Sequence, residues 1–600
     1  MRCSCVLGPL LAVFILFPAS SVAAHGASSA LAVPCVVEQV NILARDGDHH
    51  HHHGHHDTPK LELNETEIQM YHGPTPPSYY TIDWEDAESK PRYPGLIAAH
   101  ALFMSLAFFG ALPVGIAMRS VKHSAHSLAV LSFYGLCTLG WLTSSLYTKL
   151  TPNMYDGSKH GTHSWMILLF ALTLTVIDVF AGIRRCIAYF RSGEKFDLKT
   201  FWQTAILNRV TLNGTVEYAR LVQEPEEYEI PEVGAQRNAT EWSNGARGHI
   251  RQSSEGTIFS PESPSNSEDT LNDLKARNLD RSSKLTRFGN ISFVVGERIL
   301  VFAGFAQVLS GIIVYTGGCR GGYINVCLAH LIKGGIFWCY GLVTFARFLG
   351  LFAEYGWAWN RAPSGTPYSA EFVESLVIFA YGISNTWMER FGAKAGDPYT
   401  TKQIQHISIA VMFWFAGLIG MGIESKRIRK WLASSAILSY KTTSGQGVVE
   451  APPSYSGSFN PFPALVIGVT GAAMSAHFQP YVFEVQIHAL WGNLLVAFSV
   501  LRCFTYFFLW LGPPRSILPS RPPTEALGSF FLACGGLVFM MSTEELTIAA
   551  MRRGRDDVMM FLNVAVAITC LAFCWTLTIV GFKGWLKMRA NPATSRCVTV

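Results

Sequence analysis

The chain has little charge and none of the short motifs of soluble enzymes. Of its 600 residues, 15% are charged and 49% are hydrophobic. It contains no glycine-rich nucleotide loop, no HExxH motif, and no serine or cysteine nucleophile with an evident base. These absences exclude a recognisable soluble catalytic domain or a flavin or nicotinamide module in this sequence. The net charge of +5 does not indicate nucleic-acid binding, because the basic residues lie mostly beside apolar segments.

Cysteine is scattered, and the CxxC spacing of metal or redox sites is absent. Several of the 13 cysteines fall inside apolar segments, where the thiol behaves as a small hydrophobe. Cys319 and Cys327 are different, because they flank a short loop that the topology described below places outside. An oxidising compartment favours a disulfide between them. A bonded pair and two free thiols both stay open at this point.

Long apolar runs dominate the rest of the sequence. About 20 such residues span a bilayer, and backbone groups in lipid must bond internally, so each run is expected to be a helix. The sequence therefore predicts an all-α polytopic membrane bundle of about eleven transmembrane helices. The expected helices cover residues 95–118, 127–147, 163–183, 297–316, 325–350, 370–388, 404–424, 461–479, 485–511, 526–547 and 558–581.

The N-terminal region predicts entry into the secretory pathway. Residues 1–24 have the pattern of a signal peptide, with an uncleaved anchor as the alternative. Residues 25–94 are polar and Pro-rich, and we expect an outer tail that is disordered in large part. Within it, Asp48–Asp57 holds seven histidines, which are either a metal-chelating tract or a low-complexity tract. Asn64 begins a glycosylation sequon.

A polar segment divides the apolar part in two. Residues 191–296 are rich in Ser, Asn, Glu and Arg, and predict a disordered cytosolic linker that could be phosphorylated and bind cytosolic partners. It separates a three-helix membrane domain, 95–190, from an eight-helix domain, 297–590, which a cytosolic tail, 591–600, follows.

The charges between the helices predict the orientation of the chain. With the N-terminus outside, basic residues fall inside at every short loop except Met551–Asp557. We expect the protein in the lipid bilayer of the endoplasmic reticulum, vacuole or plasma membrane, with a cytosolic C-terminus.

Histidine has the most distinctive placement. In this topology five histidines each begin a helix that enters from the outside: His100, His163, His330, His406 and His488. Ionisable groups in membrane helices usually face the bundle interior and often mark sites. Imidazole binds haem iron, copper and zinc, and it relays protons near neutral pH. The alternative is that histidine is simply a tolerable residue at the membrane interface.

Two kinds of site fit this pattern. A bis-histidine haem needs two ligands at equal depth on facing helices, and His100 with His163 meets the depth condition. His406 meets it with either His330 or His488.

A divalent-metal site is the other possibility, for copper, zinc or iron. His477 ends the eighth helix on the outer side, and three carboxylates sit at the same edge: Glu484, Glu544 and Glu545. Together with His488 these groups could hold a metal ion or simply mark the interface. Lys333, one turn below His330, argues against a cation at that histidine.

Four stretches carry a resemblance to a known family: PGLIAAHALFMSLAFFGALPVGI, YTKLTPNMYDGSKHGTHSWMILL, GGCRGGYINVCLAHLIKGGIFWCYGLVTFARFLG and EVQIHALWGNLLVAFSVLR. Together they resemble the fungal "yeast putative transmembrane protein" family, over most of residues 90–190 and 297–590. The three-helix part also resembles eukaryotic transmembrane cytochrome b and ferric-reductase cores. That resemblance implies haem-linked electron transfer, with His100 and His163, and as a further candidate His126, as ligands.

The sequence departs from those cytochromes in one respect. Their two haems need ligand pairs near both membrane faces, whereas the inner face here offers His123 and His126 and little else. Three hypotheses stay open: an outer-face haem or metal site with a redox role, a transporter or metal-handling protein, and a receptor or scaffold that acts through residues 191–296.

Overall fold

The computed structural model describes residues 58–85, 92–191, 197–202, 269–362, 368–388, 398–444, 449 and 451–591. Predictions for the signal peptide, the histidine tract, most of the 191–296 linker and the tail after residue 591 lie outside these residues. The described part is helical and contains no strand. Its one β-bridge joins Lys60 to Tyr481.

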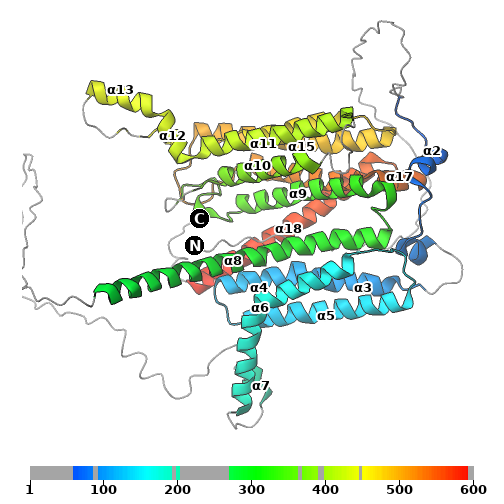
Figure 1. Ribbon diagram of the computed structural model, residues 1–600, viewed down its shortest axis with the longest axis horizontal. Coiled ribbons are helices and arrows are strands. Elements are labelled where there is room, and N and C mark those ends of the chain that lie inside the picture. The colour runs from blue at the N-terminus through cyan, green and yellow to red at the C-terminus, as the bar shows by residue number, and fades with distance from the viewer. Residues whose placement is uncertain are drawn as a thin grey trace, which may run out of the picture. The chain divides into compact units, whose positions relative to one another are not determined.

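Each of the eleven expected segments contains a helix (Figure 1). The first is a continuous helix of three parts, because a π-helical stretch, η2 (Leu106–Ala111), interrupts it. In chain order the helices are α3 (Pro94–Ser105) with η2 and α4 (Leu112–Ser120), α5 (His126–Leu150), α6 (His160–Arg191), α8 (Asp269–Thr316), α9 (Ile324–Phe348), α10 (Ala370–Met388), α11 (Thr401–Glu424), α14 (Phe462–Ser475), α15 (Val482–Leu511), α16 (Pro523–Met541) and α18 (Val558–Ala590). Within the described residues, eight helices are long and apolar enough to cross a membrane, which confirms the predicted fold class.

Two boundaries differ from the sequence-based expectation. The helix expected over 526–547 ends at Met541, and a separate helix, α17 (Glu544–Arg552), follows. Thr543 is extended there, and the two glutamates after it occupy the first turn of α17, where acidic side chains complement the helix dipole. At the other boundary, α8 begins at Asp269, inside the segment expected to be a linker.

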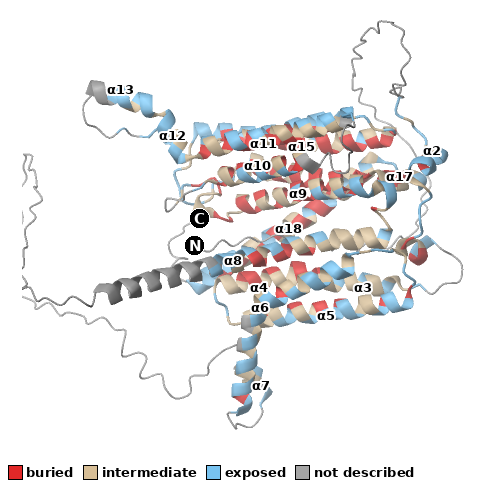
Figure 2. Ribbon diagram, viewed as in Figure 1, coloured by how far each residue is buried: buried red, intermediate tan, exposed pale blue. Residues whose placement is uncertain are grey.

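The chain divides into two compact units, residues 1–183 with 294–600, and residues 184–293. The first unit contains the main core, where α16 packs against α9 and α15. Trp338, Trp491 and Phe498 are among its fully buried side chains. Large apolar residues such as Trp165 and Phe508 are exposed, as lipid contact requires. Figure 2 shows exposed residues along the outer helices, such as α5 and α11.

Glycine allows the closest helix crossings in this core. A Cβ on Gly492 of α15 would lie 2.4 Å from the carbonyl oxygen of Gly471 on α14. A Cβ on Gly536 of α16 would lie 2.4 Å from the backbone nitrogen of Trp338 on α9. Small residues let membrane helices approach this closely, and dispersion contacts between the backbones then hold the helices together.

Residues 25–94 were expected to be disordered in large part, but residues 58–85 have a defined structure. We call this segment the strap. It contains a short helix, α2 (Glu65–His72), and a π-helical turn, η1 (Thr81–Glu85). Asn64 caps α2 by accepting a hydrogen bond from the Glu67 N–H at 3.3 Å. Figure 1 shows α2 beside α17 at one end of the bundle. The polar composition of the strap does not reveal this ordered structure, because the strap is held mostly by polar contacts to residues far away in the sequence.

Candidate functional site

Four of the predicted histidines line one cavity of about 110 Å³. His330 comes from α9, His406 from α11, His488 from α15, and His477 from the segment after α14. Glu484 and Glu544 also line it, so six of the nine predicted haem- or metal-binding residues converge here. We call this the histidine cavity, and its end of the bundle the histidine end.

The helices that carry His406 and His488 begin in different ways. Thr400 and Gln403 form a reciprocal capping box at the start of α11, two turns before His406. The start of α15 is fixed by the strap, because the Lys60 N–H donates to Pro480 O at 2.9 Å and the Val482 N–H donates to Lys60 O at 3.0 Å. These bonds hold the backbone between His477 and His488.

The histidines are arranged as two pairs. The ring centroids of His330 and His488 lie 5.8 Å apart at 84°, and those of His406 and His477 lie 5.8 Å apart at 46°. His330 Nδ1 lies 2.8 Å from Val326 O, and His488 Nδ1 lies 2.8 Å from Glu484 O. A carbonyl can only accept, so Nδ1 carries the proton and the lone pair of each neutral ring is on Nε2. Metal-binding histidines are commonly oriented in this way.

Both polar groups and aromatic rings line the cavity. Trp491 stacks on Phe539 with centroids 4.0 Å apart, and both line the cavity together with Phe337. Glu484 is 2% exposed and accepts a hydrogen bond from the Thr547 hydroxyl at 2.8 Å. A volume of 110 Å³ holds several waters or a small ion with part of its hydration shell. It is well below the roughly 300–1,000 Å³ of drug-sized ligand pockets.

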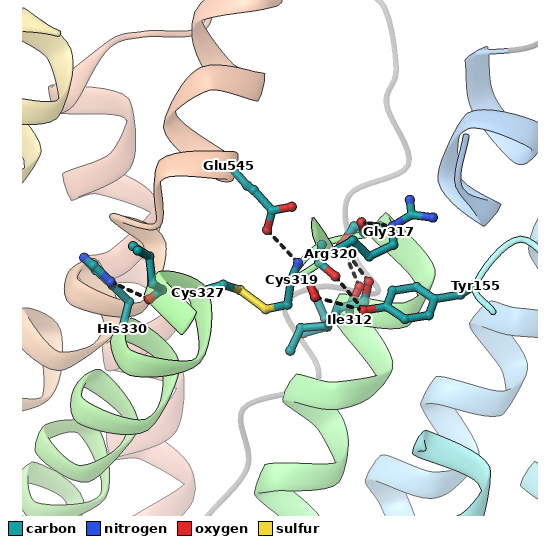
Figure 3. Close-up of a disulfide and its surroundings, with 12 residues drawn as sticks. Tyr155, Ile312, Gly317, Cys319, Arg320, Cys327, His330 and Glu545 are labelled. Carbon is teal, nitrogen blue, oxygen red and sulfur yellow. Dashed lines mark hydrogen bonds between the residues drawn. A yellow bond between two sulfur atoms is a disulfide. The ribbon is translucent and has the colours of Figure 1, made fainter. Parts of the chain in front are cut away.

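Glu545 does not belong to the cavity, which corrects the expectation from sequence. A disulfide joins Cys319 to Cys327, and the Glu545 carboxylate accepts the Cys319 N–H at 2.6 Å (Figure 3). Burial raises the pKa of Glu545, while its hydrogen bonds to the loop backbone oppose that rise. The disulfide ties the end of α8 to the start of α9, three residues before His330. Within the described residues, these two cysteines with Glu545 are the one trio of ligand atoms close enough to share a metal, and the disulfide leaves no thiolate to bind it.

The strap borders the same cavity. His72 Nε2 lies 3.1 Å from Glu544 Oε1, and the His72 ring stacks on Tyr323 with centroids 3.9 Å apart. Ile68 is buried in a small apolar cluster with Tyr481. The strap therefore contacts both the rim carboxylate and the backbone leading into α15.

The structure does not pair His100 with His163. His163 is exposed, whereas His160, one turn earlier on α6, faces His100 with centroids 6.4 Å apart at 80°. His160 Nδ1 lies 2.9 Å from Ser310 Oγ, and His100 Nδ1 lies 2.8 Å from Gly140 O. The helix α6 begins at His160, and contacts with Ser310 and Gln307 of α8 place the His160 ring inside, while His163 is exposed. His160 was not selected in the sequence analysis, although His160 and His163 are only three residues apart in the sequence HGTH.

These geometries do not fit a bis-histidine haem. Axial ligands present a ring nitrogen to the iron from each side of a flat macrocycle. The histidine cavity, of about 110 Å³ and lined by apolar and polar side chains together, is too small for a macrocycle, and His163 does not face His100. His126 fits no better, because Arg119 donates to its Nε2 at 3.0 Å and Gly115 O lies 3.0 Å from its Nδ1.

A second cluster was missed entirely by the sequence reasoning. Two arginines and three glutamates meet between four helices: Arg347 (α9), Glu371 and Glu374 (α10), Arg502 (α15) and Glu525 (α16). We call this the Arg–Glu network. Its side chains are between 0% and 10% exposed. One feature of the sequence could have indicated this network. Arg502 lies well inside an expected apolar helix, where a charge is costly unless it is paired.

Comparison with known proteins agrees with this architecture. The family model "Protein YTP1-like, C-terminal" matches residues 303–584, and "Domain of unknown function (DUF2427)" matches residues 82–185. An uncharacterized membrane protein of Schizosaccharomyces pombe is 32% identical over 529 residues, which cover 82% of this chain and 94% of that protein. The chain belongs to the YTP1-like family.

The chain is also similar to two proteins of Saccharomyces cerevisiae. One, an uncharacterized membrane protein, is 38% identical over 324 residues, covering 51% of this chain and 50% of that protein. Protein YTP1 is 26% identical over 288 residues, covering 48% of this chain and 53% of that protein. No solved structure matches. The family and the apolar helices together make this an integral membrane protein, and neither family description names a cytochrome b or a ferric reductase.

Proposed function

We propose that this protein is a transporter that takes a divalent transition-metal ion, such as zinc or copper, from the outer side of the membrane. The observation that carries the proposal is the convergence of His330, His406, His477 and His488 on one cavity. Imidazole nitrogen is a preferred ligand of both ions. The disulfide at the same end is consistent with an outer, oxidising location.

The arrangement suits transport better than permanent binding. A structural zinc site holds four ligands at about 2.0–2.3 Å from the ion in a closed tetrahedron. Here the histidines form two separate pairs, and no three ligand atoms of the described cavity residues lie close enough to form such a site. A loosely held, partly hydrated ion can leave again, which transport requires.

The charges of the lining favour a cation. Glu484 and Glu544 against Lys333 leave one formal negative charge when the histidines are neutral. Protonation of the histidines would reverse this balance and remove the nitrogen lone pairs that bind a metal, so we expect zinc binding to be weaker in acid than at neutral pH.

The other end of the same helices is closed. Arg347, Arg502 and their glutamate partners are buried between α9, α10, α15 and α16, all of which also line the histidine cavity. An open site at one end and ion pairs at the other match one state of an alternating-access cycle.

The test is metal uptake into proteoliposomes that contain the full chain and a trapped metal-sensitive dye. We expect His488→Ala and His406→Ala each to reduce zinc or copper uptake about tenfold, the equivalent of about 1.4 kcal/mol of lost binding. His163→Ala is the matched control, because His163 is exposed and lies outside the cavity. Equal uptake by all three variants and the parent protein would refute the proposal.

A further inference from the structure

The Arg–Glu network contains more acid than base. Arg347 Nη2 lies 3.0 Å from Glu371 Oε1, and Arg347 also contacts Glu374. Arg502 Nη1 lies 3.2 Å from the other oxygen of Glu374. Arg502 Nε lies 2.6 Å from Glu525 Oε1. Three carboxyl groups thus share two guanidinium groups.

Among the ion pairs of the described residues, none brings a third cation to the network. Glu424 lies near enough to Glu371 to repel it, but it pairs with Arg429 at 3.4 Å and accepts the Ser369 hydroxyl at 2.6 Å. The phenols of Tyr340 and Tyr506 come from α9 and α15, and the Tyr506 hydroxyl accepts a hydrogen bond from Arg502 Nη1 at 3.3 Å, so neither phenol adds a positive charge. The ion pairs of the described residues therefore leave one carboxyl in excess.

A buried, uncompensated carboxylate is costly, and a proton is the simplest way to remove its charge. Glu374 is held by both arginines and is the carboxyl best stabilised in its charged form. Glu525 has a 2.6 Å contact to Arg502. Glu371 has the longest contact to its arginine partner, 3.0 Å, and is the one with a second carboxylate, Glu424, nearby. By these contacts Glu371 has the weakest ion pair of the three carboxyl groups.

The network lies far along the same helices from the histidine cavity. His488 and Arg502 are fourteen residues apart on α15, which is about 21 Å at 1.5 Å per residue. His330 and Arg347 are seventeen residues apart on α9, which is about 26 Å. These spans approach the roughly 30 Å hydrocarbon core of a bilayer. Trp338, Leu495 and Phe498 fill the space between and are fully buried.

We infer that Glu371 is an exchangeable proton site and that the Arg–Glu network is a proton-controlled closure of the end opposite the histidine cavity. With its proton, Glu371 leaves the network neutral and closed. When the proton passes from the Glu371 carboxyl to water at that end, the network gains one negative charge and the helices are driven apart. This coupling role rests on the proposed transport function, whereas the proton site itself does not.

The proton site is tested without transport, by infrared spectroscopy of the purified full chain at neutral pH. We expect a carbonyl band of a protonated carboxyl that shifts in D₂O and is lost in Glu371→Gln. Glu354→Gln is the matched control, because Glu354 is exposed and lies at the same end of α9. Retention of the band in Glu371→Gln, or its absence from the parent protein, would overturn the inference.

The coupling is tested in the proteoliposome assay. Raising the pH on the network side should accelerate zinc uptake by the parent protein, up to about tenfold per pH unit for release of one proton. Glu371→Gln should remove this dependence, and Glu354→Gln should keep it. If zinc uptake by the parent protein does not depend on the pH at the network side, the coupling is refuted, but the transporter proposal is not. Absent uptake would refute the transporter, while the infrared result would still decide the proton site.

Discussion

His72 of the strap and Glu544 of the cavity rim are in contact, with Nε2 and Oε1 3.1 Å apart, although 472 residues separate them in the sequence. The His72 ring is also stacked on Tyr323. Glu544 can therefore interact either with the strap or with a cation in the cavity, and the two interactions compete for the same carboxylate.

Replacing His72 by Phe should strengthen metal binding in the cavity. The phenyl ring keeps the stacking on Tyr323, while Glu544 loses its competing partner. A hydrogen bond of about 0.5–1.5 kcal/mol corresponds to a roughly two- to tenfold gain in affinity, measured by calorimetric titration with zinc. Tyr71→Phe, on the exposed face of the same helix, should change nothing. Weaker or unchanged binding in His72→Phe would contradict the competition.

The strap should be released at low pH. The Arg552 guanidinium donates to both oxygens of Glu65 at 2.8 Å, and this bond holds the pKa of Glu65 below its usual value of 4.5. A carboxyl with a lowered pKa stabilises the folded state above 4.5 and loses that contribution as pH falls through the lowered value. Both side chains are partly exposed, so the contribution is small, about 0.2–1 kcal/mol.

Hydrogen exchange over residues 58–85 measures this release. Relative to the intrinsic amide exchange rate at each pH, we expect lower protection below about pH 4.5, and the same loss of protection at neutral pH in Arg552→Gln. Arg555→Gln is the control, because Arg555 is exposed on the same loop. Exchange that is identical in Arg552→Gln and Arg555→Gln would show that this pair does not hold the strap.

Removing the disulfide should destabilise the histidine end. Cys319 and Cys327 are eight residues apart, and closing so short a loop contributes about 2–3 kcal/mol in the chain-entropy model. Cys319→Ser with Cys327→Ser should lower the thermal midpoint and weaken zinc binding, since the bond fixes the turn that precedes His330. The control is Cys503→Ser, a free and exposed cysteine. A peptide map of the parent protein without a Cys319–Cys327 crosslink would contradict the structure here.

Gly492→Ala should disrupt the crossing of α14 and α15. Its Cβ would lie 2.4 Å from Gly471 O, so the helices must separate at a cost of about 1–3 kcal/mol or more. Gly581→Ala is the matched control in α18, because a Cβ there meets nothing within 4 Å. That change should be neutral or stabilise by up to about 1 kcal/mol. Thermal unfolding in detergent distinguishes the two variants, and an equal midpoint would argue against the close crossing.

Much of the architecture was predictable, because the bilayer imposes it on the sequence. Each expected span contains a helix, since apolar runs of this length can satisfy their backbone in lipid only in this way. The convergence of His330 and His488 was also within reach, because both begin helices from the same side. The exposure of His163 was not, because packing of α6 against α8 decides that His160 and not His163 faces inward.

The sequence by itself determined that this is a helical membrane protein with histidines gathered near one end, because hydropathy and helix length are local properties. Tertiary structure alone decided which of them share a cavity, that Glu545 caps a loop instead, and that the strap is ordered. It also decided that Arg347 and Arg502 meet three glutamates. The physical reason is that these relationships depend on which helix faces contact one another, and that is set by packing between residues that are far apart in the chain.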